Sequence, residues 1–169
     1  MPYSSKWKTW KSIDDLKRCL KCEENNGKIY AMDEIVDPKP PIHFNCRCFI
    51  AKLEKLLAGN ATKLGVKGAD WYLKYYGKLP DYYITEKDAK SLGYKKKLGN
   101  LHDVLPGRMI FRGIYKNKNG HLPSADGRIW YEADINYEQG YRNTERILFS
   151  NDGLIFVTYD HYFNFIEIQ

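Results

Sequence analysis

Four ionisable side chains near the end of the sequence have the types that acid–base cleavage of a phosphodiester requires. They are Glu132, Arg142, Arg146 and His161. A carboxylate can accept the proton of an attacking hydroxyl group, a histidine can protonate a leaving oxygen, and arginines can balance the charge that builds up on phosphorus. Positions on neighbouring antiparallel strands can converge on one face of a sheet, so these residues form a candidate active site that needs no metal.

The same four residues also have a purely structural interpretation. A glutamate in a strand usually faces solvent, two arginines four positions apart are usually surface charges, and a histidine in a short connection is usually a surface residue. Residue type and spacing alone therefore leave both interpretations open.

The elements that would carry these residues are strands. Apolar and β-branched residues concentrate in four runs, at residues 128–133, 146–150, 154–159 and 163–168. The sequence NDG at residues 151–153 is typical of a tight hairpin turn. Glu132 falls within the first run, and His161 falls between the last two.

Helical spacing precedes the strands. An amphipathic helix that ends at Gly77 is predicted by the spacing of Ala69, Tyr72, Leu73 and Tyr76. Residues 85–93 predict a second short helix because they begin with a threonine that can cap and end in glycine, and a third is expected near residues 100–103. Helices followed by hairpin-linked strands predict an α+β fold, with N-terminal helices packed on an antiparallel β-sheet.

All four cysteines lie before residue 50, as Cys19, Cys22, Cys46 and Cys48, and His43 precedes the second pair. Four such ligands satisfy a tetrahedral zinc ion, while two disulfides or free thiols are the alternatives. The close spacing within each pair favours metal. We expect a small Cys-rich module in which a structural zinc, bound by the four cysteines or with His43 in place of one, compensates for a small core.

Residues 51–60 connect the two parts of the chain. Their mixture of apolar and charged residues, with Gly59 near the end, predicts a short helix. We place the domain border at about residue 60. This gives a Cys-rich module at residues 1–60 and a larger domain at residues 61–169.

The composition is that of a folded, basic protein. Hydrophobic residues make up 43% and aromatic residues 15% of the 169 residues, which argues against disorder. The formal net charge of +6 favours acidic partners such as nucleic acid. No apolar run reaches the roughly 18–20 residues of a membrane helix. Residues 1–7 also lack an apolar signal core, so we expect a soluble protein without a membrane partner, or a piece of a longer chain.

A collinear series of motifs extends over the larger domain. The motifs are LPDYYIT at residues 79–85, LG at 92–93, GNLHDVLPG at 99–107, GHLP at 120–123, GRIWYEADINY at 127–137, GYRN at 140–143, ERIL at 145–148 and DHY at 160–162. In this order they resemble the barnase-type bacterial ribonucleases over roughly residues 64–169. The resemblance implies a metal-independent endoribonuclease that cleaves single-stranded RNA by transphosphorylation to a 2′,3′-cyclic phosphate, with no cofactor for catalysis.

The resemblance also implies roles for individual residues. Glu132 would be the general base that activates the 2′-hydroxyl group, and His161 would be the general acid that protonates the leaving 5′-oxygen. The two arginines named above would hold the scissile phosphate. Tyr162 would line the phosphate or base site, and Asp134 would brace the arginines.

This chain departs from the family at positions that affect substrate binding. Glu86 stands where the family has an active-site lysine. Lys87 is the nearest substitute, although one helical step rotates a side chain by about 100°, and its alternative is a solvated helix residue. An aspartate of the family is replaced by Gly113, which together with Arg108 and Arg112 predicts a more positive rim.

The base-reading loop at residues 115–120 differs as well. It has Asn119 where the guanine-reading loop of the family has a glutamate. An amide offers one acceptor atom, whereas a carboxylate can accept two hydrogen bonds from guanine. Asn117, Lys118 and the loop backbone are the candidates for holding a base, and we expect relaxed or altered base specificity.

A cysteine pattern spans residues 6–50 and includes PPIHFNCRC at residues 40–48. It resembles the cysteine motif of Mu-type phage head-morphogenesis (minor capsid) proteins. This resemblance implies the toxin domain of a phage, prophage or secreted polymorphic toxin protein that acts in the target-cell cytoplasm, with an immunity or inhibitor protein such as one like barstar. The alternatives are a catalytically weak RNA-binding or virion-structural module, and a nuclease for tRNA or another structured RNA.

Overall fold

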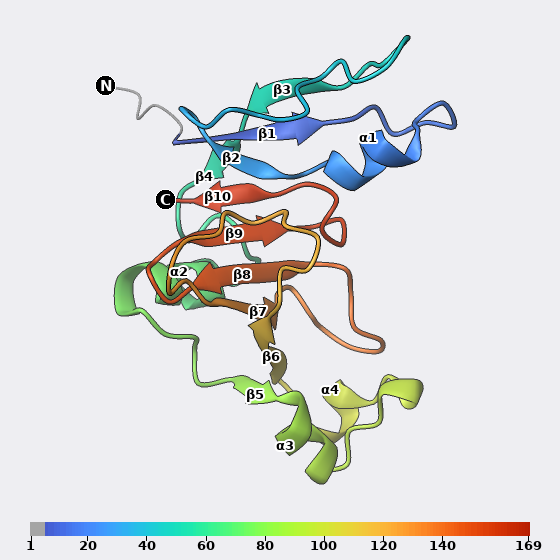
Figure 1. The fold of residues 1–169 in the computed structure, drawn as a ribbon. Coiled ribbons are helices and arrows are strands. Elements are labelled where there is room, and N and C mark those ends of the chain that lie inside the picture. The colour runs from blue at the N-terminus through green and yellow to red at the C-terminus, as the bar shows by residue number, and fades with distance from the viewer. Residues whose placement is uncertain (1–5) are drawn as a thin grey trace.

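Residues 6–169 are described by the computed structural model, and residues 1–5, part of the segment examined for a signal sequence, lie outside them. The described residues form a seven-stranded and a three-stranded sheet (Figure 1). The larger sheet has the order β4-β10-β9-β8-β7-β6-β5. Its strands are β4 (Glu54–Leu56), β5 (Tyr83–Thr85), β6 (Met109–Tyr115), β7 (Trp130–Asp134), β8 (Arg146–Ser150), β9 (Ile155–Thr158) and β10 (Ile166–Ile168).

Strands β6 to β10 are antiparallel, and the edge strands β4 and β5 run parallel to their neighbours. Side chains alternate between the two faces of a strand. On one face Ala133, Ile147 and Val157 are buried in the core to which helix α2 (Ala69–Tyr76) contributes. Glu132 therefore lies on the other face, away from α2.

Helix α2 confirms the predicted amphipathic helix and ends at Gly77, whose φ of 67° is left-handed. Its Asp70 is completely buried. The Asp70 carboxylate accepts hydrogen bonds from the amides of Gly59 at 2.7 Å and Ala61 at 3.0 Å and from the hydroxyl group of Thr62 at 3.2 Å. These bonds tie the start of α2 to the segment that precedes it.

The other predicted helices of the larger domain are present as α3 (Glu86–Ser91) and α4 (Leu101–Val104). Thr85 caps α3, because its hydroxyl oxygen accepts the amide hydrogen of Asp88 at 3.1 Å. Short 3-10 turns occur at Gly65–Lys67 and Lys96–Leu98. The predicted α+β fold class is thus confirmed. Among residues 6–169, no helix combines the length and the apolar character that crossing a membrane requires.

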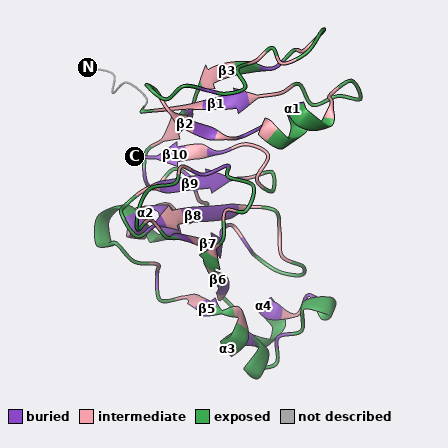
Figure 2. Cartoon of the chain, viewed as in Figure 1, coloured by how far each residue is buried: buried purple, intermediate pink, exposed green. Residues whose placement is uncertain are grey.

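The smaller sheet is antiparallel with the order β2-β1-β3. Trp10 is completely buried in a core that it shares with Cys22 and Cys48. Ile29 belongs to the same apolar cluster as Phe156 of the larger sheet, and buried stretches run through both sheets (Figure 2). The strands of the smaller sheet are β1 (Trp7–Lys11), β2 (Ile29–Ala31) and β3 (Phe49–Lys52), and helix α1 (Leu20–Asn25) lies between β1 and β2 in the chain.

The helix predicted for residues 51–60 is wrong. The last residues of β3, which pairs with β1, and all of β4, which pairs in parallel with β10, lie in this segment. The apolar residues of this short segment follow neither the helical nor the strand period clearly. Pairing with the open edges of the two sheets therefore determines its structure. Strand β4 lies before the predicted border at residue 60 and yet belongs to the larger sheet, and the border itself stays a prediction.

Other strands also differ from the sequence patterns. Strands β1, β2, β3, β5 and β6 were not predicted, and β6 contains a register shift between Phe111 and Gly113 that interrupts its alternation. Strand β10 begins at Ile166 rather than at residue 163. The residues before it form a loop, in which the Asn164 amide donates to the Asp160 carboxylate at 2.8 Å.

Replacing the buried Asp70 carboxylate should destabilise the protein. In Asp70→Ala the amides of Gly59 and Ala61 lose their acceptor, and we expect the free energy of unfolding to fall by about 2–4 kcal/mol. Urea denaturation followed by tryptophan fluorescence measures this loss. Asp103→Ala, at an exposed position of α4, is the matched control and should cost less than about 0.5 kcal/mol. Equal stability of the two variants would contradict the anchoring role of Asp70.

Candidate active site

Strand alternation places the charged residues of β7 and β8 on the face away from α2. Glu132 and Asp134 are two residues apart in β7, so their side chains point the same way. Asp134 lies opposite Arg146 of β8, and Arg146 lies opposite Thr158 of β9. All four residues are buried. The sheet register therefore places Asp134, Arg146 and Thr158 in one row, with Glu132 two residues along β7 on the same face.

Asp134 holds both arginines of the predicted site. Its carboxylate accepts two hydrogen bonds from Arg142, at 2.5 Å from Nε and 2.6 Å from Nη2. The Nε atom of Arg146 lies 3.2 Å from the Asp134 Oδ1 atom. Such a two-pronged pair fixes the plane of a guanidinium group. The structure thus brings Asp134, Arg142 and Arg146 together, and the roles of the two arginines toward a phosphate stay predictions.

Glu132 is 6% exposed and faces three potential partners. Its carboxylate oxygens lie 3.7 Å from Nε of Arg112 and 3.8 Å from Nε of Arg146, and one of them accepts a hydrogen bond from the Tyr162 hydroxyl group. Burial raises the pKa of Glu132 above its ordinary value, and the two arginines partly oppose that shift. A carboxylate in this setting can remain ionised and still be a stronger base than an exposed one.

His161 is exposed in the loop between β9 and β10, next to the tyrosine that contacts Glu132. Its ring centre lies 4.8 Å from that of Tyr162, which stacks on Tyr115 at 5.8 Å. His161 and Tyr162 have φ angles of 57° and 73°. Consecutive left-handed residues with side chains are uncommon, and strain of this kind often marks functional sites.

The start of α3 carries Glu86 and Lys87 in different surroundings. Glu86 is half-buried, and its pKa is lowered first by the hydrogen bond that Lys90 donates and further by the charges of Arg112 and Arg142. Lys87 is exposed. The structure therefore places Glu86 in the field of the active-site arginines, and a role for Lys87 in substrate binding stays a prediction.

Asn117 closes the predicted base-reading loop on itself. Its side-chain nitrogen donates to the Leu122 carbonyl at 2.8 Å, and its side-chain oxygen accepts from the Leu122 amide at 3.0 Å. Lys118 and Asn119 are exposed at the tip of the loop. Asn117 thus shapes the loop, and base contacts by Asn117 or Lys118 stay predictions.

Arg112 contacts Glu132 although the sequence analysis assigned it only to the rim. Gly113 pairs with Glu132 in the sheet at the register shift of β6, and its φ of 79° is one that side chains rarely adopt. A glycine within a strand can signal such a bulge. The sequence could therefore have suggested the irregularity, but not which side chain it directs to the carboxylate.

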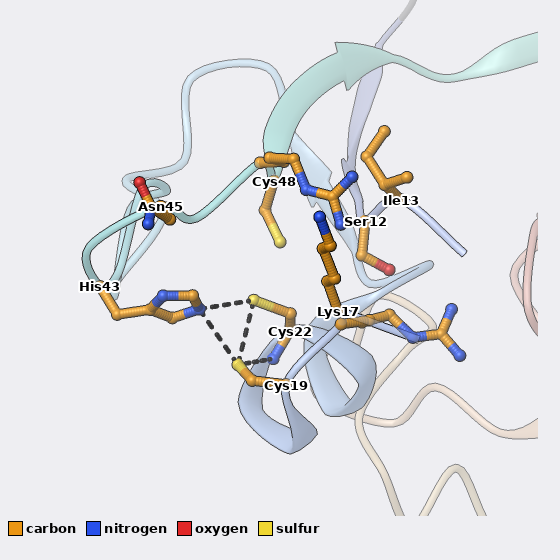
Figure 3. Close-up of a pocket in the computed structure, with 10 residues that line it drawn as sticks. Ser12, Ile13, Lys17, Cys19, Cys22, His43, Asn45 and Cys48 are labelled. Atoms are coloured by element: carbon orange, nitrogen blue, oxygen red, sulfur yellow. Dashed lines mark hydrogen bonds between the residues drawn. The ribbon is translucent and has the colours of Figure 1, made fainter. Parts of the chain in front are cut away.

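Two of the predicted metal ligands meet His43 at the start of α1 (Figure 3). The Nε2 atom of His43 lies 3.1 Å from the Cys19 sulfur and 3.3 Å from the Cys22 sulfur, and the two sulfurs are 3.3 Å apart. The Nδ1 atom of His43 lies 2.8 Å from the Phe44 carbonyl oxygen, a contact that leaves Nε2 free to bind a metal.

Cys22 also belongs to a second group, with Cys46 and Cys48, whose sulfur atoms lie within 4.8 Å of one another. The Cys22 and Cys46 sulfurs are 3.8 Å apart, and all four cysteines are free thiols. Bond lengths of about 2.3 Å to sulfur and 2.0–2.1 Å to nitrogen would separate tetrahedral zinc ligands by roughly 3.5–3.8 Å. Cys22 thus belongs to two groups of three ligands whose donor types suit a zinc-class ion, with measured separations of 3.1–3.8 Å close to that range.

Comparisons with known proteins agree with the geometry of the larger sheet. A family model described as ribonuclease matches residues 69–169. A ribonuclease of Heyndrickxia coagulans is 49% identical over 98 residues, which are 58% of this chain and 90% of that protein. Ribonucleases of Bacillus intermedius and Bacillus pumilus are likewise 49% identical over 98 residues, and the match spans 60% of their length. This chain therefore belongs to the barnase-type family of bacterial ribonucleases, whose substrate is RNA.

Proposed function

We propose that this ribonuclease cleaves single-stranded RNA by general acid–base catalysis, with Glu132 as the base and His161 as the acid. The observation that carries the proposal is the buried Glu132 carboxylate, which Tyr162 connects to the exposed loop of His161. Arginines held by Asp134 lie beside it. A base within the site and an acid at its rim can act on opposite sides of one phosphate.

The proposed reaction has two steps. Glu132 first takes the proton of the 2′-hydroxyl group while the 2′-oxygen attacks phosphorus. The bond from phosphorus to the 5′-oxygen breaks, His161 protonates that oxygen, and a 2′,3′-cyclic phosphate forms. Water then attacks the cyclic phosphate with the two roles exchanged, which restores both residues. Arg142 and Arg146 stabilise the negative charge on the phosphoryl oxygens in both steps.

We assign base recognition to the loop at residues 115–120. Asn117 gives the loop its shape, while Lys118 and Asn119 at the exposed tip are free to meet a base or phosphate. Relaxed specificity is expected because the Asn119 amide offers guanine only one acceptor. Lys87, exposed on α3, would add positive charge for RNA at longer range.

The setting we propose is that of a toxin domain of a phage, prophage or secreted toxin protein, acting in the cytoplasm of a target cell. The support is the resemblance of the cysteine pattern at residues 6–50 to phage head-morphogenesis proteins. A cell that produces such a nuclease needs an inhibitor. The net charge of +6 favours an acidic inhibitor, of which barstar is the type.

We propose further that a structural zinc-class ion is held by Cys19, Cys22, His43 and Cys46. The support is the convergence of a ring nitrogen and two sulfurs on Cys22 at 3.3–3.8 Å. In this set His43 replaces Cys48, which belongs with Cys22 and Cys46 to the second group of three. The ion would crosslink a module with a small core and would take no part in the cleavage.

Loss of either proposed catalytic group should nearly abolish turnover. Glu132→Gln and His161→Gln should each slow cleavage of a fluorescent single-stranded RNA, without added divalent cations, by roughly 100- to 10,000-fold. Glu138→Gln and His102→Gln, at exposed positions, are the matched controls. Full activity of Glu132→Gln or His161→Gln would overturn the assigned roles.

The acidic limb of the pH profile of kcat/KM should follow the ionisation of Glu132. Burial raises the pKa of Glu132, and Arg112 is the charge that lowers it most. Arg112→Gln removes that charge, so the pKa rises further and the limb should move to higher pH. Lys74→Gln, an exposed cation on α2, should leave the limb in place. A limb that stays or moves to lower pH in Arg112→Gln would contradict Glu132 as the base.

The ligand set can be read from metal binding. Cobalt substituted into the full chain should show the absorption of three thiolates and one imidazole. In competition with a chromophoric chelator, His43→Ala and Cys46→Ser should lose metal more readily than the wild type, whereas Cys48→Ser should not. Metal loss in Cys46→Ser and Cys48→Ser but not in His43→Ala would contradict this set and identify the four cysteines as the ligands.

A further inference from the structure

The cysteine-bearing module makes direct contact with the loop that carries His161. This loop, residues 159–165, is called the catalytic loop below. Asn26 is 2% exposed, and its side-chain nitrogen donates to the Phe163 carbonyl at 2.6 Å. Its side-chain oxygen accepts from the amide and the hydroxyl group of Ser12, at 2.8 and 3.0 Å. A buried amide with all these partners holds the two segments in one relative position.

Further contacts reach the same part of the catalytic loop. The Gly27 backbone packs so closely on the loop that an added Cβ atom would lie 2.6 Å from the Phe163 carbonyl oxygen. The Arg18 guanidinium lies 4.8 Å from the centre of the Phe163 ring. Lys11 donates to the side chain of Asn164 at 2.6 Å. The module thus contacts both the backbone and the side chains that follow His161 and Tyr162.

The catalytic loop has a reason to need this support. The left-handed φ angles of His161 and Tyr162 are unfavourable for residues with side chains, and such conformations persist only when the surroundings enforce them. Within the loop, the Asp160 carboxylate accepts from Thr158 and Asn164. The contacts from the module reach Phe163 and Asn164, the two residues that follow His161 and Tyr162.

The cysteine–histidine cluster lies at the beginning of α1, the helix whose C-cap is Asn26. Cys19 is the N-cap of α1, and its sulfur accepts a hydrogen bond from the backbone amide of Cys22. At the other end, the backbone amide of Asn26 donates to the carbonyls of Cys22 and Glu23. The same helix also contacts the residue that follows the base-reading loop, because Nε2 of His121 lies 3.3 Å from the Glu24 carbonyl oxygen. A single short helix therefore separates the proposed ion from the catalytic loop.

We propose that the N-terminal module braces the catalytic loop, with Asn26 as the positioning residue that keeps His161 oriented for protonation of the leaving oxygen. The ion at the cysteine–histidine cluster holds the brace rigid and so sets the activity without touching the substrate. This inference rests on the proposed role of His161 as the general acid.

Two substrates with different leaving groups test the brace in the full chain. The 5′-alkoxide of RNA must be protonated as it leaves, whereas 4-nitrophenolate, the leaving group of a nucleoside 3′-(4-nitrophenyl phosphate), needs no acid. Asn26→Ala should slow RNA cleavage roughly tenfold, because it frees the loop that positions His161, and should change cleavage of the aryl ester by less than about twofold. Asn25→Ala is the matched control, because this adjacent, half-buried asparagine bonds to Lys21 and Lys28 rather than to the catalytic loop.

The split between substrates distinguishes positioning from general destabilisation. Equal slowing of both substrates by Asn26→Ala, or no slowing with RNA, would overturn the proposal. Lys11→Met removes a separate contact, that with Asn164, and should give the same split even if Asn26→Ala fails to fold. The metal content of each variant is measured as well. Tenfold slower RNA cleavage by Asn26→Ala at full metal content supports Asn26 as the positioning residue.

Amide hydrogen exchange tests the metal part without measuring activity. The Tyr162 and Asn164 amides donate within the loop, to Thr158 and Asp160. After removal of the metal, and in Asn26→Ala, these amides should exchange faster than in the zinc-loaded protein, while those of β7 and β8 should not change. Unchanged exchange would overturn the brace. Absence of RNA cleavage by the wild type would refute the proposed function, and the exchange comparison would still decide on the brace.

Discussion

The buried Asp134 carboxylate is the constraint on which the active-site face depends. A charge that is 1% exposed is tolerated only when it is paired, and removing one partner of such a pair costs about 3–5 kcal/mol. Asp134 therefore requires Arg142 and Arg146, and β7 and β8 must keep the register in which Asp134 faces Arg146. The same register sets Glu132 within reach of Arg146. Pairing of one carboxylate thus arranges the groups that we propose hold a phosphate.

Glu132 connects this face to the rest of the protein. Burial raises its pKa while neighbouring arginines lower it, so a reactive group is kept where a core residue would be more stable. Tyr162 extends the connection from the sheet to the catalytic loop, and Phe163 extends it to the cysteine-bearing module. The family domain and the module are therefore linked at the loop that presents His161. Strand β4 links them a second time, at the edge beside β10.

Local signals predicted those elements whose causes lie within a few residues. The cap at Thr85, the glycine that ends α2 and the NDG turn between β8 and β9 act over one turn, and all are present in the structure. The helix expected at residues 51–60 failed because strand formation there depends on partners far away in the chain. The edges of β1 and β10 supplied those partners. Strand pairing of this kind cannot be read from a short window.

The active site shows the same division. Residue chemistry and motif order made Glu132, His161 and the paired arginines the candidates, because proton transfer and phosphate binding demand particular groups. Folding selected which charges meet: a bulge at Gly113 accompanies the approach of Arg112 to Glu132, and Glu86 pairs with Lys90 within α3. It also engaged Asn117 within its own loop and brought Asn26 to the catalytic loop. Register, burial and contacts between distant segments arise only on packing, so no local pattern encodes them.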